Sequence, residues 1–164
     1  MKRIGLISDT HSYLDDAVFK HFDQCDEIWH AGDFGNMEVA DKLAAFKPLR
    51  GVYGNIDSQD VRIVYPEHLK FDCEDVKVWI THIGGYPGKY NPKLLAELKQ
   101  NSPDLFICGH SHILKVIYDK KFNLLHLNPG AAGKYGWHHV RTLLRFSVSE
   151  KKIHTLDVIE LGNK

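Results

Sequence analysis

Short apolar segments alternate with helical patterns through the first 57 residues, and this order limits the possible folds more than any other feature. Residues 4–7, 26–31 and 49–53 are short runs typical of strands. Apolar residues recur at helical spacing over 14–22 and 37–46. A β-α-β-α-β order is typical of a parallel sheet whose strands are joined by crossover helices. The first part of the chain is therefore predicted to form an α/β layer.

The rest of the chain is predicted to be rich in strands. Ser12 is the expected N-cap of the first helix, and a further helix is expected over 92–100. Strands are expected at 61–64, 69–73, 76–80, 105–108, 114–118, 123–127, 142–148 and 153–159. No linker, repeat or low-complexity segment interrupts the sequence. We therefore predict one compact α/β domain with two sheets over residues 1–164.

Composition narrows the classes of function. The chain has 21 Lys and Arg against 21 Asp and Glu, so its zero net charge gives no strong nucleic-acid signal. No segment approaches the roughly 18 consecutive apolar residues of a membrane span, and the N-terminus lacks the pattern of a signal peptide. The three cysteines are widely spaced and odd in number, which favours a reduced protein without disulfides. We expect a cytoplasmic protein with no membrane partner.

Metal-binding side chains follow five of the predicted strands, directly after each strand ends. They are Asp9 and His11, Asp33, Asn55 and Asp57, His82, and His110 and His112. In open α/β sheets, ligands bind beyond the carboxyl ends of the strands. A glycine precedes three of the groups and permits the tight turn that directs the next side chain inward. Their oxygen and nitrogen donors suit manganese, zinc, iron or nickel.

These motifs resemble, in their order, the calcineurin-like metallophosphoesterase superfamily. They read Asp9-Thr10-His11, Gly32-Asp33, Gly54-Asn55-Ile56-Asp57, His82 and Gly109-His110-Ser111-His112. The resemblance covers residues 3–134, includes Asn128-Pro129-Gly130, and is strongest to small single-domain bacterial and archaeal phosphodiesterases. It implies a β-sandwich of two mixed sheets flanked by helices, in an α/β/β/α arrangement.

The resemblance also implies a role for each ligand. Asp9, His11, Asp33 and His112 would hold one metal ion, and Asp33, Asn55, His82 and His110 a second, with Asp33 bridging. Asp33, Asn55 and His82 are accordingly also expected to be catalytic. Two divalent cations against two carboxylates leave about two positive charges to attract a phosphate. Two metals roughly 3.5–4 Å apart can share a hydroxide and clamp the phosphoryl oxygens.

These roles together predict a dinuclear metal-dependent phosphodiesterase that attacks a small phosphoester with a metal-bridging hydroxide. We expect manganese first among the metals. Zinc, iron, nickel and cobalt are alternatives, because mixed oxygen and nitrogen ligands without thiolate do not choose among them.

The chain departs from many members of the superfamily at Ile56, where they carry a histidine thought to protonate the leaving group. We therefore expect activated aryl phosphodiesters to react faster than alkyl esters. His138 or His139 is a candidate replacement. Asp57 is expected to orient an imidazole through hydrogen bonds. Lys89 is expected near a substrate phosphate, although its glycine-rich loop lacks the spacing of a P-loop.

Two other classes of function compete with this prediction. A retromer-type subunit with the same fold acts as a non-catalytic protein-interaction scaffold, but such subunits have lost ligand histidines, whereas this chain keeps them all. A nuclease would require a basic groove, which zero net charge disfavours, although small oligonucleotides and cyclic nucleotides remain candidate substrates. Exposed edge strands and aromatic residues favour a homodimer.

Overall fold

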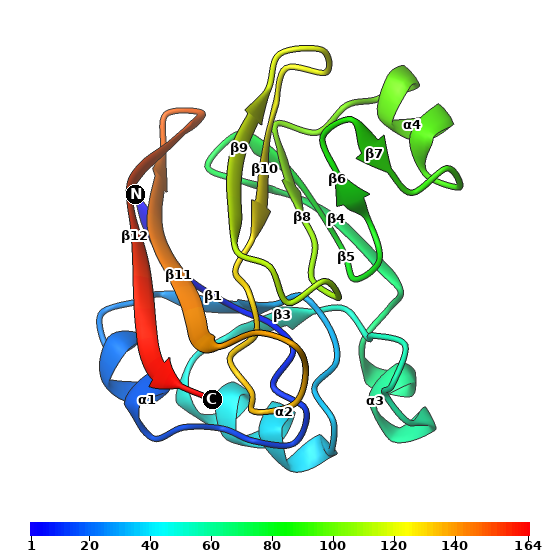
Figure 1. Ribbon diagram of the computed structural model, residues 1–164. Helices are drawn as coiled ribbons and strands as arrows, with labels where there is room; N and C mark the ends of the chain where they lie inside the picture. The colour runs from blue at the N-terminus through cyan, green and yellow to red at the C-terminus, as the bar shows by residue number, and fades with distance from the viewer.

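Two five-stranded mixed sheets face each other in the computed structural model, which describes residues 1–164 (Figure 1). The first sheet has the order β12 (Lys152–Asn163), β11 (Val140–Ser149), β1 (Lys2–Ile7), β2 (Glu27–His30) and β3 (Leu49–Gly51). The second has the order β4 (His68–Cys73), β5 (Val76–Thr81), β8 (Leu105–Ile107), β10 (Leu124–Asn128) and β9 (Lys115–Asp119). Strands β1–β3 run parallel, as do β5, β8 and β10, and the other strands add antiparallel.

The main hydrophobic core lies between the two sheets, where Trp29 and Phe146 of the first sheet share a cluster with Ile80 and Ile107 of the second. Helices cover the outer faces (Figure 1). Helices α1 (Ala17–His21) and α2 (Met37–Phe46) pack on the first sheet, and α4 (Leu95–Gln100) packs on the second. This arrangement confirms the predicted α/β/β/α sandwich. No helix is long and apolar enough to cross a membrane.

Three local predictions were wrong. Residues 61–64 belong to helix α3 (Gln59–Val64) rather than to a strand, and only Val61 of this helix is buried. The β-branched residues of this segment favoured a strand, but Arg62, Ile63 and Val64 face solvent and the segment pairs with neither sheet. The expected loop at 84–88 belongs to a two-stranded hairpin of β6 (Gly85–Tyr86) and β7 (Lys89–Tyr90).

The third wrong prediction is the start of the first helix. Ser12 has a φ of 67°, a left-handed conformation in which it does not cap a helix. Its hydroxyl instead accepts a hydrogen bond of 2.9 Å from the backbone N–H of Asn36. Helix α1 starts five residues later, where Asp15 Oδ1 accepts a 2.9 Å hydrogen bond from the N–H of Ala17.

The loops that follow the parallel strands of both sheets meet at one place. The N–H of Asp9, after β1, donates to the carbonyl of Gly32, after β2, at 3.0 Å. The N–H of Gly109, after β8, donates to the carbonyl of His82, after β5, also at 3.0 Å. The N–H of His110 then reaches across to the carboxylate of Asp9 at 3.1 Å. The fold therefore brings the carboxyl ends of two sheets together at a single site.

Candidate metal centre

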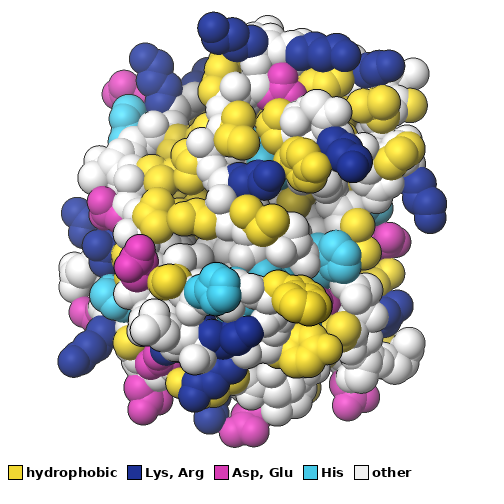
Figure 2. All heavy atoms as spheres, viewed as in Figure 1, with side chains coloured by type: hydrophobic (Ala, Val, Ile, Leu, Met, Phe, Trp, Pro, Cys, Tyr) yellow, Lys and Arg dark blue, Asp and Glu magenta, His cyan; other side chains and the backbone are white.

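The loops after the strands gather the predicted ligands into two neighbouring groups. One group is Asp9, His11 and His112, and the other is Asp33, His82 and His110, with the candidate ligand atoms of each group within 4.8 Å of one another. Asn55, the seventh predicted ligand, places Oδ1 3.0 Å from Nδ1 of His110. Histidines gather across the middle of one face of the molecule, with Lys or Arg side chains above and below them (Figure 2).

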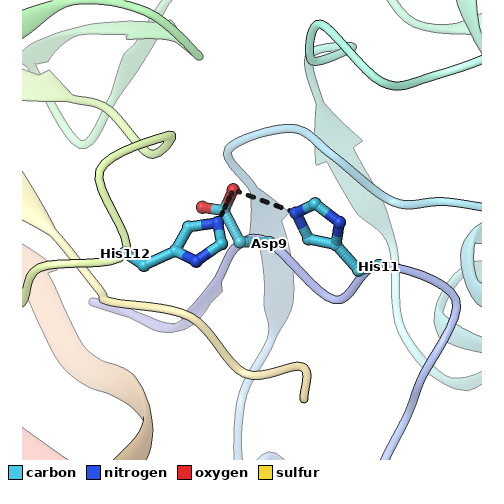
Figure 3. A group of neighbouring side chains, drawn as sticks. All are labelled: Asp9, His11 and His112. Carbon is cyan, nitrogen blue, oxygen red and sulfur yellow. Dashed lines mark ion pairs between the residues drawn. The ribbon is translucent and has the colours of Figure 1, made fainter. Parts of the chain in front are cut away.

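The two oxygens of the Asp9 carboxylate have different surroundings. Oδ2 accepts hydrogen bonds from the hydroxyl of Ser8 at 2.7 Å and from the N–H of His110 at 3.1 Å. Oδ1 accepts none and lies 3.1 Å from Nε2 of His112 and 3.8 Å from Nε2 of His11. Figure 3 shows both imidazoles turned toward this one oxygen from opposite sides. One oxygen anchors the carboxylate and the other faces the histidines.

Asp33 has the same division of its oxygens. Oδ1 accepts a 3.1 Å hydrogen bond from the N–H of Ile56. Oδ2 lies 3.3 Å from Nε2 of His11 in the first group and 3.1 Å from Nε2 of His82 in the second. Asp33 therefore lies between the two groups, where a bridging carboxylate would be required.

Several buried polar atoms of the site have no hydrogen-bond partner. They are Oδ1 of Asp9, Nε2 of His11 and Nε2 of His82. Nδ1 of His82 donates to the carbonyl of Ala31 at 2.7 Å, so that in the neutral imidazole Nε2 carries a free lone pair. Buried polar atoms are nearly always paired in native proteins. These unpaired carboxylate and imidazole donors, with no thiolate among them, fit two divalent cations.

The backbone of the site is strained at the ligands themselves. Asp9, His11, Asp33, His110 and His112 have φ angles between 46° and 74°. Residues other than glycine adopt this left-handed region at a cost of order 1–3 kcal/mol each, and such strain concentrates at functional sites. The fold thus tolerates an unfavourable conformation at five ligands in order to direct their side chains into one place.

Two glycines allow the carboxylates to lie this close to neighbouring loops. A Cβ on Gly109 would lie 2.8 Å from Oδ2 of Asp9 and closer still to the hydroxyl of Ser8. A Cβ on Gly54 would collide with Oδ1 of Asp33. The glycines ahead of the ligands therefore provide the space in which the two aspartates are anchored.

The carboxylates and imidazoles shift one another's proton affinity. Burial opposes ionisation of Asp9 and Asp33, but contacts with histidines outweigh burial and lower the pKa of both carboxyls. The contact with Asp33, and then that with Asp9, raises the pKa of His11 to about 9. Burial works against a charge on His82, yet Asp33 and Asp9 still raise its pKa. The site therefore has a strong affinity for positive charge, which protons or metal cations can supply.

A cleft of about 710 Å³ opens beside the second group. Its lining includes Asn55 and His82, two of the candidate metal ligands. The cations Arg62, Lys89 and Lys93 also line it. Clefts of roughly 300–1,000 Å³ are typical of small-molecule sites. The second group of ligands is thus open, through Asn55 and His82, to a molecule of that size.

The family model of the Calcineurin-like phosphoesterase superfamily domain matches residues 1–151 of this chain. The chain belongs to this superfamily. A probable metallophosphoesterase of Methanocaldococcus jannaschii is 34% identical over 134 residues, which is 78% of this chain and 67% of that protein. The family assignment supports a metal-dependent phosphoester hydrolase and accounts for the order of the five motifs.

Solved structures of other proteins show the same fold. An archaeal phosphodiesterase aligns over 97% of this chain and 99% of its own, with a TM-score of 0.78 and 22% identity. Vps29 from Entamoeba histolytica, complexed with Zn²⁺, aligns over 98% of both chains, with a TM-score of 0.74 and 16% identity. Both likenesses establish the metallophosphoesterase fold.

Within this metallophosphoesterase, Asp57 contacts different partners from those expected. Its carboxylate accepts hydrogen bonds from the N–H groups of Phe34, Gly35 and Gly54, at 3.2, 2.9 and 2.8 Å. No imidazole is among its partners, which corrects the expected contact. The loop after β3 folds back against the loop after β2, and the carboxylate therefore binds backbone amides that tie the Asn55 loop to the Asp33 loop.

His138 and Lys89 lie on different sides of the metallophosphoesterase site. The His138 ring is 5.2 Å from that of His112, and its Nε2 is 2.7 Å from the carbonyl of Gly133. Lys89 is exposed on β7 and lines the cleft beside the second group. His139, the other candidate substitute for the missing histidine, has its carbonyl bound by the N–H of Lys164 at 3.0 Å.

Four residues outside the predicted ligand set support the ligands, and sequence reasoning gave Ser8 and Tyr135 no role at the site. Ser8 anchors Asp9, and Asn128 donates to the carbonyl of Gly109 and the hydroxyl of Ser111, each at 3.1 Å. His30 accepts from the N–H of Gly32 at 3.0 Å, one residue before Asp33. Tyr135 stacks on His11 with ring centroids 5.1 Å apart. Asn128 carried a sequence signal as part of the motif with Pro129 and Gly130, and His30 through its position just before Gly32-Asp33.

Proposed function

We propose that this protein is a dinuclear metal-dependent phosphodiesterase that hydrolyses a small phosphoester with water as the nucleophile. The observation that carries the proposal is the position of Asp33 Oδ2, within 3.3 Å of an imidazole nitrogen from each of the two ligand groups. The likeness to an archaeal phosphodiesterase supports a diester substrate. Asp33, Asn55 and His82 are the proposed catalytic residues, because Asn55 and His82 line the cleft and Asp33 contacts His82 beside it.

Each group of ligands would hold one cation. Asp9, His11, His112 and Asp33 would hold the first, and Asp33, Asn55, His82 and His110 the second. When bound, two divalent cations supply an activated water and neutralise charge on the phosphoryl oxygens. We propose manganese first, and the zinc complex of a protein with this fold supports zinc as an alternative.

The protein's own residues prepare the site for that chemistry. Ser8 and the N–H of His110 hold Asp9, and the N–H of Ile56 holds Asp33, so both carboxylates are oriented before any ligand arrives. Preorganised groups avoid reorganisation during the reaction.

The cysteine nearest the ligands is not a candidate nucleophile. Burial raises the pKa of Cys108, the cysteine nearest the ligands in sequence, far above its ordinary value, and its thiol is fully buried. A protonated, enclosed thiol is a poor nucleophile. Water is therefore the proposed attacking group.

A protein-interaction scaffold is the second candidate function. Its support is the likeness to Vps29 and the exposure of Tyr135 and Trp137, which are 71% and 96% exposed. The ligand groups favour catalysis over this alternative, since a scaffold gains nothing from strained backbone at five metal-binding side chains.

Hydrolysis of bis-p-nitrophenyl phosphate tests the proposed function. We expect no turnover after chelation and recovery with manganese or another divalent metal. His82→Gln should lose activity, while His21→Gln, an exchange on helix α1, should not. Protein that binds two equivalents of metal and turns over no phosphoester would contradict the enzyme and favour the scaffold.

Three further expectations belong to this proposal. Residues 1–164 act as one metallophosphoesterase domain, supported by the core that both sheets share. A reducing, cytoplasmic location is supported by three buried cysteines without disulfides. A homodimer is supported by the edge strand β9, on which Val116, Ile117 and Tyr118 are exposed.

A further inference from the structure

The cleft beside the second ligand group carries an excess of positive charge. Arg62, Lys89 and Lys93 line it, and Glu67 is the one carboxylate among its lining residues. None of the three cations has a carboxylate within 4.0 Å, whereas Glu67 lies 3.9 Å from His68. Cations elsewhere in this protein do pair with carboxylates, as Lys2 and Arg50 do with Glu27. The cleft therefore presents cations without internal partners.

Arg62 is held in place by the loop that carries Asn55. Its Nε donates to the carbonyl of Asp57 at 2.8 Å, and its Nη2 donates to the carbonyl of Asn55 at 3.2 Å. The guanidinium also stacks over Tyr53, with Cζ 4.5 Å from the ring centroid. Nη1 makes no hydrogen bond to the protein. Arg62 thus has a fixed position next to a proposed metal ligand and keeps donors free for a planar or tetrahedral anion.

The two lysines lie on another wall of the cleft, which is also anchored near a ligand. The side chain of Asn91 donates to the carbonyl of Ile83 at 2.8 Å, and the N–H of Asn91 donates to the carbonyl of Gly84 at 2.9 Å. These bonds hold the turn between Lys89 and Lys93 against the residues that follow His82. Cations thus approach the cleft from two elements, each tied to a proposed ligand of the second metal.

We propose that this cleft binds a second phosphate group of the substrate, so that the natural substrate is a phosphoester with two phosphates rather than one. The inference rests on the proposed function, in which the scissile phosphate occupies the metal centre. Arg62, Lys89 and Lys93 would contact the second phosphate. A cleft of about 710 Å³ has room for a nucleoside-sized group between the two phosphates.

Two chromogenic substrates with the same leaving group test the proposal. Thymidine 5′-(p-nitrophenyl phosphate) carries only the scissile phosphate, and its 3′-phosphorylated counterpart carries a second. With manganese-loaded protein, we expect the second compound to have a kcat/KM at least roughly tenfold higher, mainly through KM, because charge-assisted hydrogen bonds have about this effect. Equal values for the two compounds would overturn the proposal.

Substitutions of the cations in the cleft test which residues cause the preference for the bisphosphate substrate. Lys93→Ala and Arg62→Gln should each reduce the preference for the bisphosphate several-fold. If Arg62→Gln disturbs the Asn55 loop, Lys93→Ala decides between the two outcomes, because the Lys93 side chain forms no hydrogen bond with that loop. Lys120→Ala, at the exposed tip of the β9–β10 hairpin, removes the same charge outside the cleft and should leave the preference intact. A preference that survives Lys93→Ala and Arg62→Gln would contradict the assignment.

Binding measurements distinguish failure of this proposal from failure of the proposed function. Calorimetry with manganese-loaded protein should show adenosine 3′,5′-bisphosphate binding at least roughly tenfold more tightly than adenosine 5′-monophosphate, and Lys93→Ala should narrow the difference. This result would support the second phosphate site even if neither chromogenic compound were hydrolysed. The absence of hydrolysis would overturn only the proposal that the protein is a phosphodiesterase. Equal affinities would overturn the subsite whatever the activity.

Discussion

Oδ2 of Asp33 lies 3.3 Å from Nε2 of His11, although the two residues belong to different metal-binding groups. The same oxygen lies 3.1 Å from Nε2 of His82 in its own group. Oδ1 of Asp33 is anchored by the N–H of Ile56, so Oδ2 cannot turn away without breaking that bond. Loss of one metal should therefore change the affinity of the other site for its metal, because Asp33 contacts both groups.

Replacing the two aspartates should separate the metal sites. Asp9→Asn should lose the first metal before the second, whereas Asp33→Asn should weaken both. Oδ2 of Asp33 lies within 3.3 Å of an imidazole from each group, whereas Oδ1 of Asp9 lies 3.1 Å from His112 of the first group and 3.8 Å from His82 of the second. We expect activity to fall by about 100-fold or more in each, since even supporting residues of metal sites change affinity or activity 10–100-fold. Metal content after dialysis, measured by mass spectrometry, distinguishes the two patterns. Asp41→Asn, on the exposed face of α2, is the matched control. Two tightly held metals in Asp33→Asn would contradict the bridging role.

Metal binding should release protons and strengthen as pH rises. Contacts with Asp33 and then Asp9 raise the pKa of His11 to about 9 in the metal-free protein, so His11 is charged at pH 7. A cation must displace that proton, and its affinity should therefore increase as the pH rises toward 9. Calorimetric titrations with manganese in buffers of different ionisation enthalpy measure the protons released. Affinity that does not change between pH 6 and pH 9, with no proton release, would contradict this prediction.

His126 should make the metal-free protein less stable in mild acid. Burial first, and then the charge of Lys115, lowers its pKa to about 4, below the value of about 6.5 in an unfolded chain. The unfolded chain therefore binds more protons between these values, so stability is complete above pH 6.5 and decreases as the pH falls toward 4. The loss attributable to His126 reaches about 3 kcal/mol.

Substitution of His126 tests this contribution. Neither ring nitrogen has a hydrogen-bond partner, and the side chain lies near the rings of Tyr90 and Phe106. His126→Leu should raise the free energy of unfolding at pH 7 by about 1 kcal/mol, because it removes an unsatisfied polar group. It should also weaken the pH dependence of the free energy of unfolding, measured by urea denaturation. An unchanged slope between pH 4 and pH 6.5 would show that other groups, such as buried His30, account for it.

Ile56 should limit the range of leaving groups. It is 46% exposed beside Asp33, and it cannot donate a proton. Rates should therefore fall steeply as the pKa of the leaving group rises from aryl to alkyl esters. Ile56→His should raise turnover of alkyl diesters by about 10²–10⁴-fold if the imidazole reaches the leaving group, and Ile56→Gln controls for polarity. Comparable wild-type rates across the leaving-group series would refute this explanation.

Much of the site could be predicted from the sequence because each ligand directly follows an apolar strand. The rule that parallel strands place their carboxyl ends at one edge groups Asp9 with Asp33 in one sheet and His82 with His112 in the other, and the family resemblance joins the two groups. The same locality made α2 predictable, since its apolar residues and Pro48 mark both the helix and its end. Residues whose role depends on the strand that they follow could therefore be predicted from the sequence.

The remaining features depend on tertiary contacts that no local pattern encodes. Asp57 binds the N–H groups of Phe34 and Gly35, more than 20 residues away, so its partners follow from how two loops pack. The segment of α3 reads as a strand by composition, yet it folds as a helix and pairs with neither sheet. The fixed guanidinium of Arg62 and the stacking of Tyr135 on His11 likewise arise only in the folded chain.

Activity measured against metal equivalents tests the central claim most directly. Metal-free protein would receive manganese in increments, with bound metal and hydrolysis of bis-p-nitrophenyl phosphate followed in the same samples. We predict little turnover up to one bound equivalent per chain and a rise to full activity as the second is bound, because both ligand groups share Asp33. Full activity at one equivalent, or none at two, would contradict a dinuclear phosphodiesterase.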